Sequence, residues 1–202
     1  MSKGLNHPGV IRVMGIDPST TNMGVWFVDV NLEKREPFKL VYGNTLYGDK
    51  LLYDVPLQFD DLASTKVMAR SYCMARSLGT LIDIYAPDVG ICEDNFLGMS
   101  ALTFKQLIQC VGLLREACSL RGLHFSMVLP NLAKAIVGVT GRGMTKDDIA
   151  EGILNYTWLD SGDHDLNVMD EHSMDAGAVT LYRCESIAKH YGVFRDDEQP
   201  TP

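Results

Sequence analysis

Apolar segments separated by short polar turns open the chain. Residues 10–16 and 24–30 are rich in Val, Ile, Trp and Phe, and the polar stretch 17–22 joins them. After a second polar turn, residues 39–46 alternate apolar and polar positions. β-Branched and aromatic residues bounded by Pro, Ser, Asn and Gly are typical of strands joined by tight connections. The pattern therefore predicts an antiparallel three-stranded meander.

The hydrophobic period changes after residue 60. Apolar residues now recur at spacings of three and four over long stretches, which indicates helices with one buried face, and shorter apolar runs between them indicate strands. The elements that we expect after the meander are, in chain order, a loop or added hairpin at 47–59, helix 61–85, strand 89–92, helix 101–120, strand 124–129, helices 131–137 and 146–159, an acidic loop at 160–170, and helix 171–191.

The order of these elements predicts the fold class. A strand, a helix and a strand in succession over 89–129 favour a right-handed parallel crossover. Together with the meander this gives an α/β fold whose mixed five-stranded sheet, part antiparallel and part parallel, is flanked by helices. The chain has 202 residues and no repeat or linker, so we expect one domain over 1–202, with 1–9 and 193–202 as flexible tails.

Composition narrows the class of protein. The hydrophobic fraction of 46% and the charged fraction of 22% are those of a soluble globular protein. The five cysteines include no C-x-x-C pair, which favours reduced, buried thiols over a disulfide or zinc framework. No apolar run approaches the length of a membrane span, and the first residues lack a signal core. We therefore expect a cytoplasmic protein, either of a bacterial cell or of a virus in its host.

Charge is weaker evidence, because its distribution matters more than its sum. The net charge of −8 argues against a general polyanion binder, since phosphate neutralisation needs clustered Lys and Arg. Lys134, Arg142 and Lys146 nevertheless form a local basic group around a glycine-rich turn. This group is either an ordinary solvated face or a pliable contact with a phosphate backbone.

Acidic residues at the ends of two expected strands suggest a metal centre. Asp17 and Glu93 each end a strand, and on adjacent parallel strands both carboxylates would emerge at the same edge of the sheet. His172 and Asp175 are three positions apart on a helix, so they share a face. Such a set suits two divalent cations. A pair of metal ions about 3.5–4 Å apart can activate water and stabilise the leaving oxygen in phosphodiester hydrolysis. Mg²⁺, which keeps waters and needs few carboxylates, fits a set this sparse.

Each candidate also has a purely structural interpretation. Asp17 precedes Pro and Ser, and turn aspartates often bond their own backbone. His172 could cap or pack its helix, Asp94 competes with Glu93, and Phe96 could be core or could stack on an unpaired base. Asp170 and Glu171 compete with His172 as ligands, although most such charges are solvated.

Four segments, in order, resemble one known family. Residues 13–19 with 24–25 resemble the opening strand of the RuvC Holliday-junction resolvases, and 87–96 resemble their second acidic strand with its following aromatic. Residues 132–138, with Arg142 and Lys146 after them, are similar to the family's basic helix–turn–helix segment, and 172–178 to its last acidic helix. With their connections, these segments span residues 11–183.

This resemblance implies a fold, an activity and a set of roles. The fold would be ribonuclease H-like, and a homodimer would nick two like strands of a four-way DNA junction during recombination and repair. The cofactor would be Mg²⁺, two ions per site, or Mn²⁺ in its place. The roles carried over are catalysis and metal binding for Asp17, Glu93, His172 and Asp175, an aromatic position beside the junction for Phe96, and DNA binding for Lys134, Arg142 and Lys146.

The chain departs from the family pattern in places. Many members have aspartate where His172 stands, and Lys134 is one residue away from the usual lysine, where this chain has Ala133. The turn between Gly138 and Lys146 is longer, and residues 31–64 look expanded.

Two other functions stay open at this stage. One is an actin-like or sugar-kinase-type phosphotransferase, because residues 15–22 also resemble the first phosphate loop of that class. Such enzymes need a second lobe with its own glycine-rich phosphate loop, and these 202 residues show no such loop, which argues against this function. The other is a non-catalytic protein that binds branched DNA. Helix 101–120 is the candidate dimer interface, since Phe104 and Ile108 lie off its main apolar face and Gly112 would permit close helix approach.

Overall fold

The first three strands form the meander that the hydrophobic pattern predicts. In the computed structural model, β1 (Val10–Asp17) pairs antiparallel with β2 (Asn22–Asn31), which pairs antiparallel with β3 (Phe38–Tyr47). The structure describes residues 9–52, 63–94, 100–141 and 145–193. The expected tails therefore lie almost wholly outside the described residues.

Parallel strands extend the sheet from β1. β4 (Val89–Glu93) pairs parallel with β1, and β5 (His124–Val128) pairs parallel with β4 after the connecting helix α3 (Ala101–Ser119). The strand order is β5-β4-β1-β2-β3-β6. The mixed α/β sheet is thus confirmed, with six strands where five are predicted.

The sixth strand and a shortened helix correct the prediction for 146–170. Helix α5 (Lys146–Leu154) ends five residues before the predicted 159, and β6 (Leu159–Asp160) pairs with the first residues of β3. The helix ends because Tyr156 turns into the core, where its hydroxyl donates to buried Glu185 at 2.8 Å. The apolar residues after Leu154 therefore pack against other elements and do not extend the helix.

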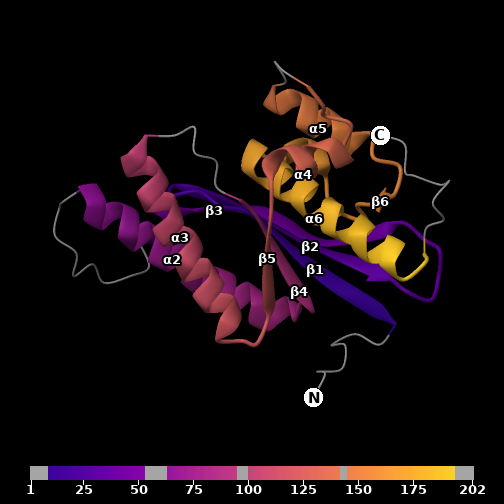
Figure 1. Cartoon of the computed structure of the whole chain (residues 1–202), viewed down its shortest axis with the longest axis horizontal. Helices are drawn as coiled ribbons and strands as arrows, with labels where there is room; N and C mark the ends of the chain where they lie inside the picture. Colours follow the sequence, from indigo (N-terminus) through magenta and orange to yellow (C-terminus); the bar gives the residue numbers. More distant parts are fainter. Residues whose placement is uncertain (1–8, 53–62, 95–99, 142–144, 194–202) are drawn as a thin grey trace.

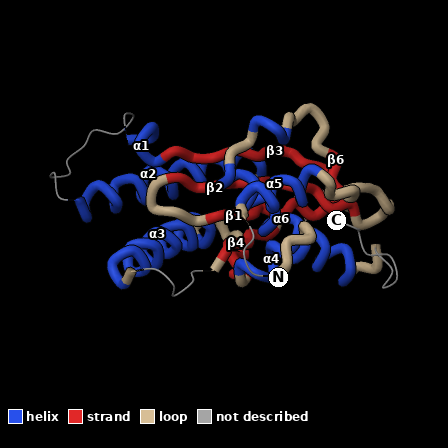
Figure 2. The backbone as a smooth tube through the Cα atoms, turned by 90° about the horizontal axis from the view of Figure 1, so that it is seen from above, coloured by secondary structure: helices blue, strands red, loops and turns tan. Residues whose placement is uncertain are grey.

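Helices cover both faces of the sheet (Figures 1 and 2). Successive β2 residues point to opposite faces, so that Val25 and Phe27 join one apolar cluster while Trp26 and Val28 join the other. The first cluster includes α2 and α3, and the second includes α4, α5 and α6. The remaining bounds are α1 (Gly48–Leu51), α2 (Ala63–Tyr85), α4 (Pro130–Ile136), the 3-10 turn η2 (Leu166–Val168) and α6 (Glu171–His190). None of the helices described is long and apolar enough to cross a membrane.

Two glycines let α6 approach the sheet closely. A Cβ on Gly24 of β2 would lie 1.8 Å from the carbonyl oxygen of His172, and one on Gly15 of β1 would lie 2.0 Å from Thr180 Oγ1. No side chain fits at such distances, so these positions need glycine. The close contact sets how near the first turn of α6 comes to the ends of β1 and β2.

Candidate active site

The parallel pairing of β1 and β4 brings two carboxylates to one sheet edge. Ile16 pairs with Cys92, so the next residues, Asp17 and Glu93, end neighbouring strands side by side. Val13 and Ile91 belong to the apolar cluster on the α6 side, and side chains alternate along a strand. Asp17 and Glu93 therefore face α6, as the strand phase predicts.

Helix α6 supplies the other two candidate residues from above this edge. The Nδ1 atom of His172 lies 3.1 Å from Oδ2 of Asp17, and these side chains are only 21% and 14% exposed. Asp175 is one turn further along α6, and its carboxylate interacts electrostatically with Asp17 and Glu93. The structure thus places all four predicted site residues at the same edge of the sheet, with Asp17 and His172 in direct contact.

Burial and mutual repulsion dominate the electrostatics of the carboxylates. Burial, with the negative charge of Asp17, raises the pKa of Glu93 to about 8 and that of Asp175 to about 6. Burial also raises the pKa of Asp17, although the hydrogen bond from His172 opposes it. That hydrogen bond in turn raises the pKa of His172. Buried carboxylates of this kind are stabilised by an added positive charge.

Two predicted basic residues lie near the acidic site. Lys134 of α4 and Lys146 of α5 both lower the pKa of Asp17 and Asp175 through their charge. Lys146 Nζ is 2.6 Å from Glu171 Oε1, and this same oxygen lies 3.7 Å from His172 Nε2. Lys134 also lines a hollow of about 540 Å³ on α4 and the following turn. Phe96 and Arg142 fall outside the described residues.

The donor set fits a hard divalent cation by its chemistry. Three partly buried carboxylates, each with a raised pKa, and one imidazole are ligands that Mg²⁺ or Mn²⁺ accepts. In the part of the chain that the structure describes, no three His, Cys, Asp or Glu side chains are grouped so as to hold a metal ion as they stand.

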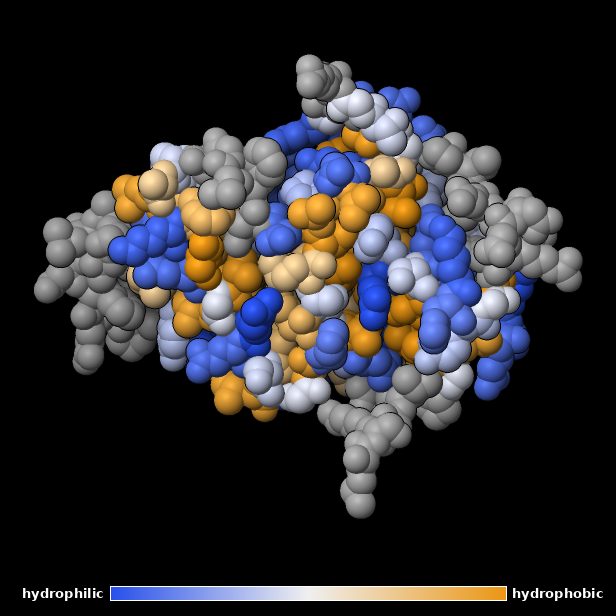
Figure 3. Space-filling model, in the orientation of Figure 1, coloured by the Kyte–Doolittle hydropathy of each residue, from blue (hydrophilic) through white to orange (hydrophobic). Residues whose placement is uncertain are grey.

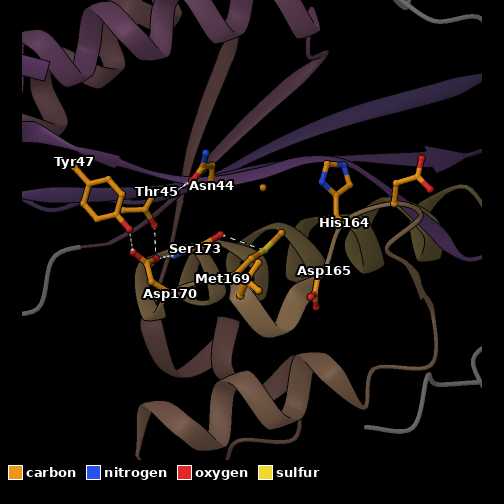
Figure 4. Close-up of a pocket in the computed structure, with 11 residues that line it drawn as sticks. Asn44, Thr45, Tyr47, His164, Asp165, Met169, Asp170 and Ser173 are labelled. Atoms are coloured by element: carbon orange, nitrogen blue, oxygen red, sulfur yellow. Dashed lines mark hydrogen bonds between the residues drawn. The ribbon is translucent and has the colours of Figure 1, made fainter. Parts of the chain in front are cut away.

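One contact beside the site is not predicted from the sequence. Asp170 caps α6 by accepting from Ser173 N at 3.0 Å, and it also accepts from Thr45 Oγ1 and, at 2.7 Å, from the Tyr47 hydroxyl (Figure 4). Burial tends to raise the pKa of Asp170, but these hydrogen bonds outweigh it and the pKa lies below its ordinary value. An acidic residue directly before a helix is a capping signal, yet nothing in the sequence indicates Thr45 and Tyr47 as partners.

Comparison with known proteins finds relatives of one kind. No family model matches the chain. It is 27% identical over 152 residues to the crossover junction endodeoxyribonuclease RuvC of Paenarthrobacter aurescens, which covers 75% of this chain and 71% of that protein. The RuvC of Corynebacterium glutamicum is 28% identical over 143 residues, 70% of this chain and 57% of that longer protein. Over most of its length the chain is thus similar to RuvC proteins.

Solved structures agree on the fold. The RuvC of Thermus thermophilus superposes with a TM-score of 0.62 at 17% identity, covering 91% of this chain and 98% of that one. The same protein in complex with a Holliday junction substrate gives 0.61 at 16% identity, with the same coverage. The ribonuclease H-like architecture implied by the RuvC resemblance is therefore confirmed.

Proposed function

We propose that this chain belongs to the RuvC family and is a structure-selective endodeoxyribonuclease that resolves four-way DNA junctions. One observation carries the proposal: Asp17 and Glu93 end adjacent parallel strands, and His172 and Asp175 meet them from α6. The names of the curated relatives and the junction-bound Thermus thermophilus RuvC support the choice of substrate.

We further propose that Asp17, Glu93, His172 and Asp175 hold Mg²⁺, two ions per site, with Mn²⁺ able to replace it. Bound metal of this kind supplies an activated water and charge stabilisation for phosphodiester hydrolysis. The support is the partial burial of the carboxylates and the raised pKa values of Glu93 and Asp175, which an added positive charge would lower toward their ordinary range.

Two lysines beside the acidic side chains would bind and orient the DNA. Lys134 and Lys146 border the acidic side chains, where their charges attract the DNA phosphates that the carboxylates repel. Lys146 is 58% exposed and its partner Glu171 is 46% exposed, so a phosphate can replace this carboxylate at low cost. By resemblance we extend the DNA contact to Phe96 and Arg142.

The protein should act as a homodimer in the cytoplasm. Resolution needs two symmetric nicks, and a two-fold dimer matches a nearly two-fold junction. On α3, Leu107, Val111 and Leu114 are buried in the chain's own core, whereas Ile108 is 48% exposed and a Cβ on Gly112 would meet nothing within 4 Å. Figure 3 shows apolar side chains at the surface over this helix, which supports α3 as the interface.

The decisive test is cleavage of a synthetic four-way junction with Mg²⁺, beside linear duplex and a flap. Wild-type protein should nick two like strands of the junction only, and ATP turnover should be absent. Asp17→Asn should abolish cleavage while junction binding stays equal or becomes tighter, because one negative charge is removed. Junction binding without cleavage by the wild type would favour the non-catalytic alternative. Nicking by Asp17→Asn at the wild-type rate would reject Asp17 as a metal ligand.

A further inference from the structure

One carboxylate ties the start of α6 to the edge of the meander. Asp170 Oδ1 accepts from Ser173 N, which caps the helix, and from Thr45 Oγ1. Its Oδ2 accepts from the Tyr47 hydroxyl at 2.7 Å. Thr45 and Tyr47 lie two positions apart on β3, so both side chains leave the same face of that strand. Figure 4 shows the two side chains converging on Asp170 from the strand.

The next residues of α6 are held against β2. The carbonyl of His172 lies directly over Gly24, and Ser173 Oγ accepts from the indole Nε1 of Trp26 at 2.9 Å. The start of α6 is therefore held to two strands: Asp170 is bonded to β3, and His172 and Ser173 contact β2. His172 is within this turn, and Asp175 follows one turn later on the same face.

Helix capping alone does not require all of these contacts. A single side-chain oxygen satisfies the cap, and Ser or Asn serves there about as well as Asp. The contacts of Asp170 to Thr45 and Tyr47 add nothing to the cap, because both donors belong to β3. Among the described residues, the side chain of Asp165, which caps the nearby turn η2, accepts hydrogen bonds from Asn167 alone, and so shows what a simple cap looks like in this chain.

We propose that Asp170, held by Thr45 and Tyr47, is a positioning residue that fixes the first turn of α6 so that His172 and Asp175 face Asp17. The inference rests on the function proposed above, since it assigns Asp170 to the support of that same site. Asp170 itself contacts neither DNA nor the reacting atoms in this assignment.

The test separates the cap from the link to β3. Asp170→Ser keeps an oxygen for Ser173 N but offers only one, on a shorter side chain, to the two β3 donors. We expect it to lower the single-turnover rate of junction cleavage by about ten- to a hundredfold, the range that follows from a displacement of about 1 Å. Junction affinity measured without Mg²⁺ should stay within about twofold of wild type, because the phosphate contacts are elsewhere.

A double-mutant cycle and a matched control complete the design. Tyr47→Phe should slow cleavage in the wild-type background and have no further effect in Asp170→Ser, because Tyr47 acts through that carboxylate. Asp165→Ser, the control cap, should cleave at the wild-type rate. A wild-type rate in Asp170→Ser would overturn the proposal, and so would an equal effect of Tyr47→Phe in both backgrounds.

A readout independent of cleavage distinguishes this inference from the proposed function. The NMR signals of the His172 imidazole at a fixed pH report its contact with Asp17. They should move in Asp170→Ser and stay unchanged in Asp165→Ser. If wild-type protein cuts no junction, the proposed function fails. The positioning inference is then overturned by unchanged His172 signals in Asp170→Ser and supported by shifted ones.

Discussion

Gly24→Ala tests whether the close approach of α6 to β2 holds the site together. The new Cβ would lie 1.8 Å from the backbone oxygen of His172 and 2.4 Å from its carbonyl carbon. A carbon and an oxygen in ordinary contact are about 3.3 Å apart, so the start of α6 must retreat by about 1.5 Å. A rotating side chain cannot relieve this contact, because the obstructing atoms are backbone.

The expected size follows from two opposing effects. Overpacking a filled core costs up to about 3 kcal/mol, and replacing glycine in a strand returns up to about 1 kcal/mol of backbone entropy. The free energy of unfolding should therefore fall by about 2 kcal/mol. Because His172 moves with the backbone, the cleavage rate should fall by about a hundredfold or more, while junction binding stays near wild type.

The measurements are urea unfolding and single-turnover junction cleavage, with Gly79→Ala as the matched control. A Cβ on Gly79 would lie 2.7 Å from Arg121 Nη2, which is the end of a flexible side chain and can move away. Gly79→Ala in helix α2 should therefore match or slightly exceed wild-type stability and cleave normally. Wild-type stability and rate in Gly24→Ala would refute the reasoning.

Three further predictions concern metal binding, DNA and assembly. His172→Ala should lose most activity at low Mg²⁺ and recover partly with more metal, whereas His172→Asp should remain active; a folded but inactive aspartate variant would count against the ligand assignment. Lys146→Ala should flatten the salt dependence of junction binding by a log–log slope of about 0.9 with little change in stability, and Glu171→Gln should tighten binding; an unchanged slope would make Lys146 an ordinary surface residue. Leu107→Glu should unfold the chain, whereas Ile108→Glu should give folded monomers by light scattering. If Ile108→Glu remains a folded dimer, this face of α3 is not the dimer interface.

Strand phase made much of the site predictable. Because side chains alternate along β1 and β4, the pairing of adjacent parallel strands is enough to place Asp17 beside Glu93. The spacing of His172 and Asp175 likewise predicts a shared helix face. Each of these inferences needs only the repeat of side chains along a strand or helix and, for the strands, the identity of one neighbouring strand.

What was missed depends on tertiary contacts that leave no periodic signal. The early end of α5 follows from the burial of Tyr156 against Glu185, and the short β6 follows from pairing with a strand formed more than a hundred residues earlier. The same holds for Asp170, whose β3 partners are 123 and 125 positions away in the chain. Local propensity cannot anticipate such pairings, because many polar residues could equally have been solvated.

The burial of α6 over β1 and β2 has a consequence for how activity is lost. Most of α6 is enclosed, and two glycines bring it into backbone contact with the sheet, so separating them would expose the main core of the molecule. Segments of this kind open only when the whole domain unfolds, and their amides exchange with solvent most slowly. Heat or denaturant should therefore abolish cleavage in step with global unfolding, because no local opening can dismantle the four-residue centre first.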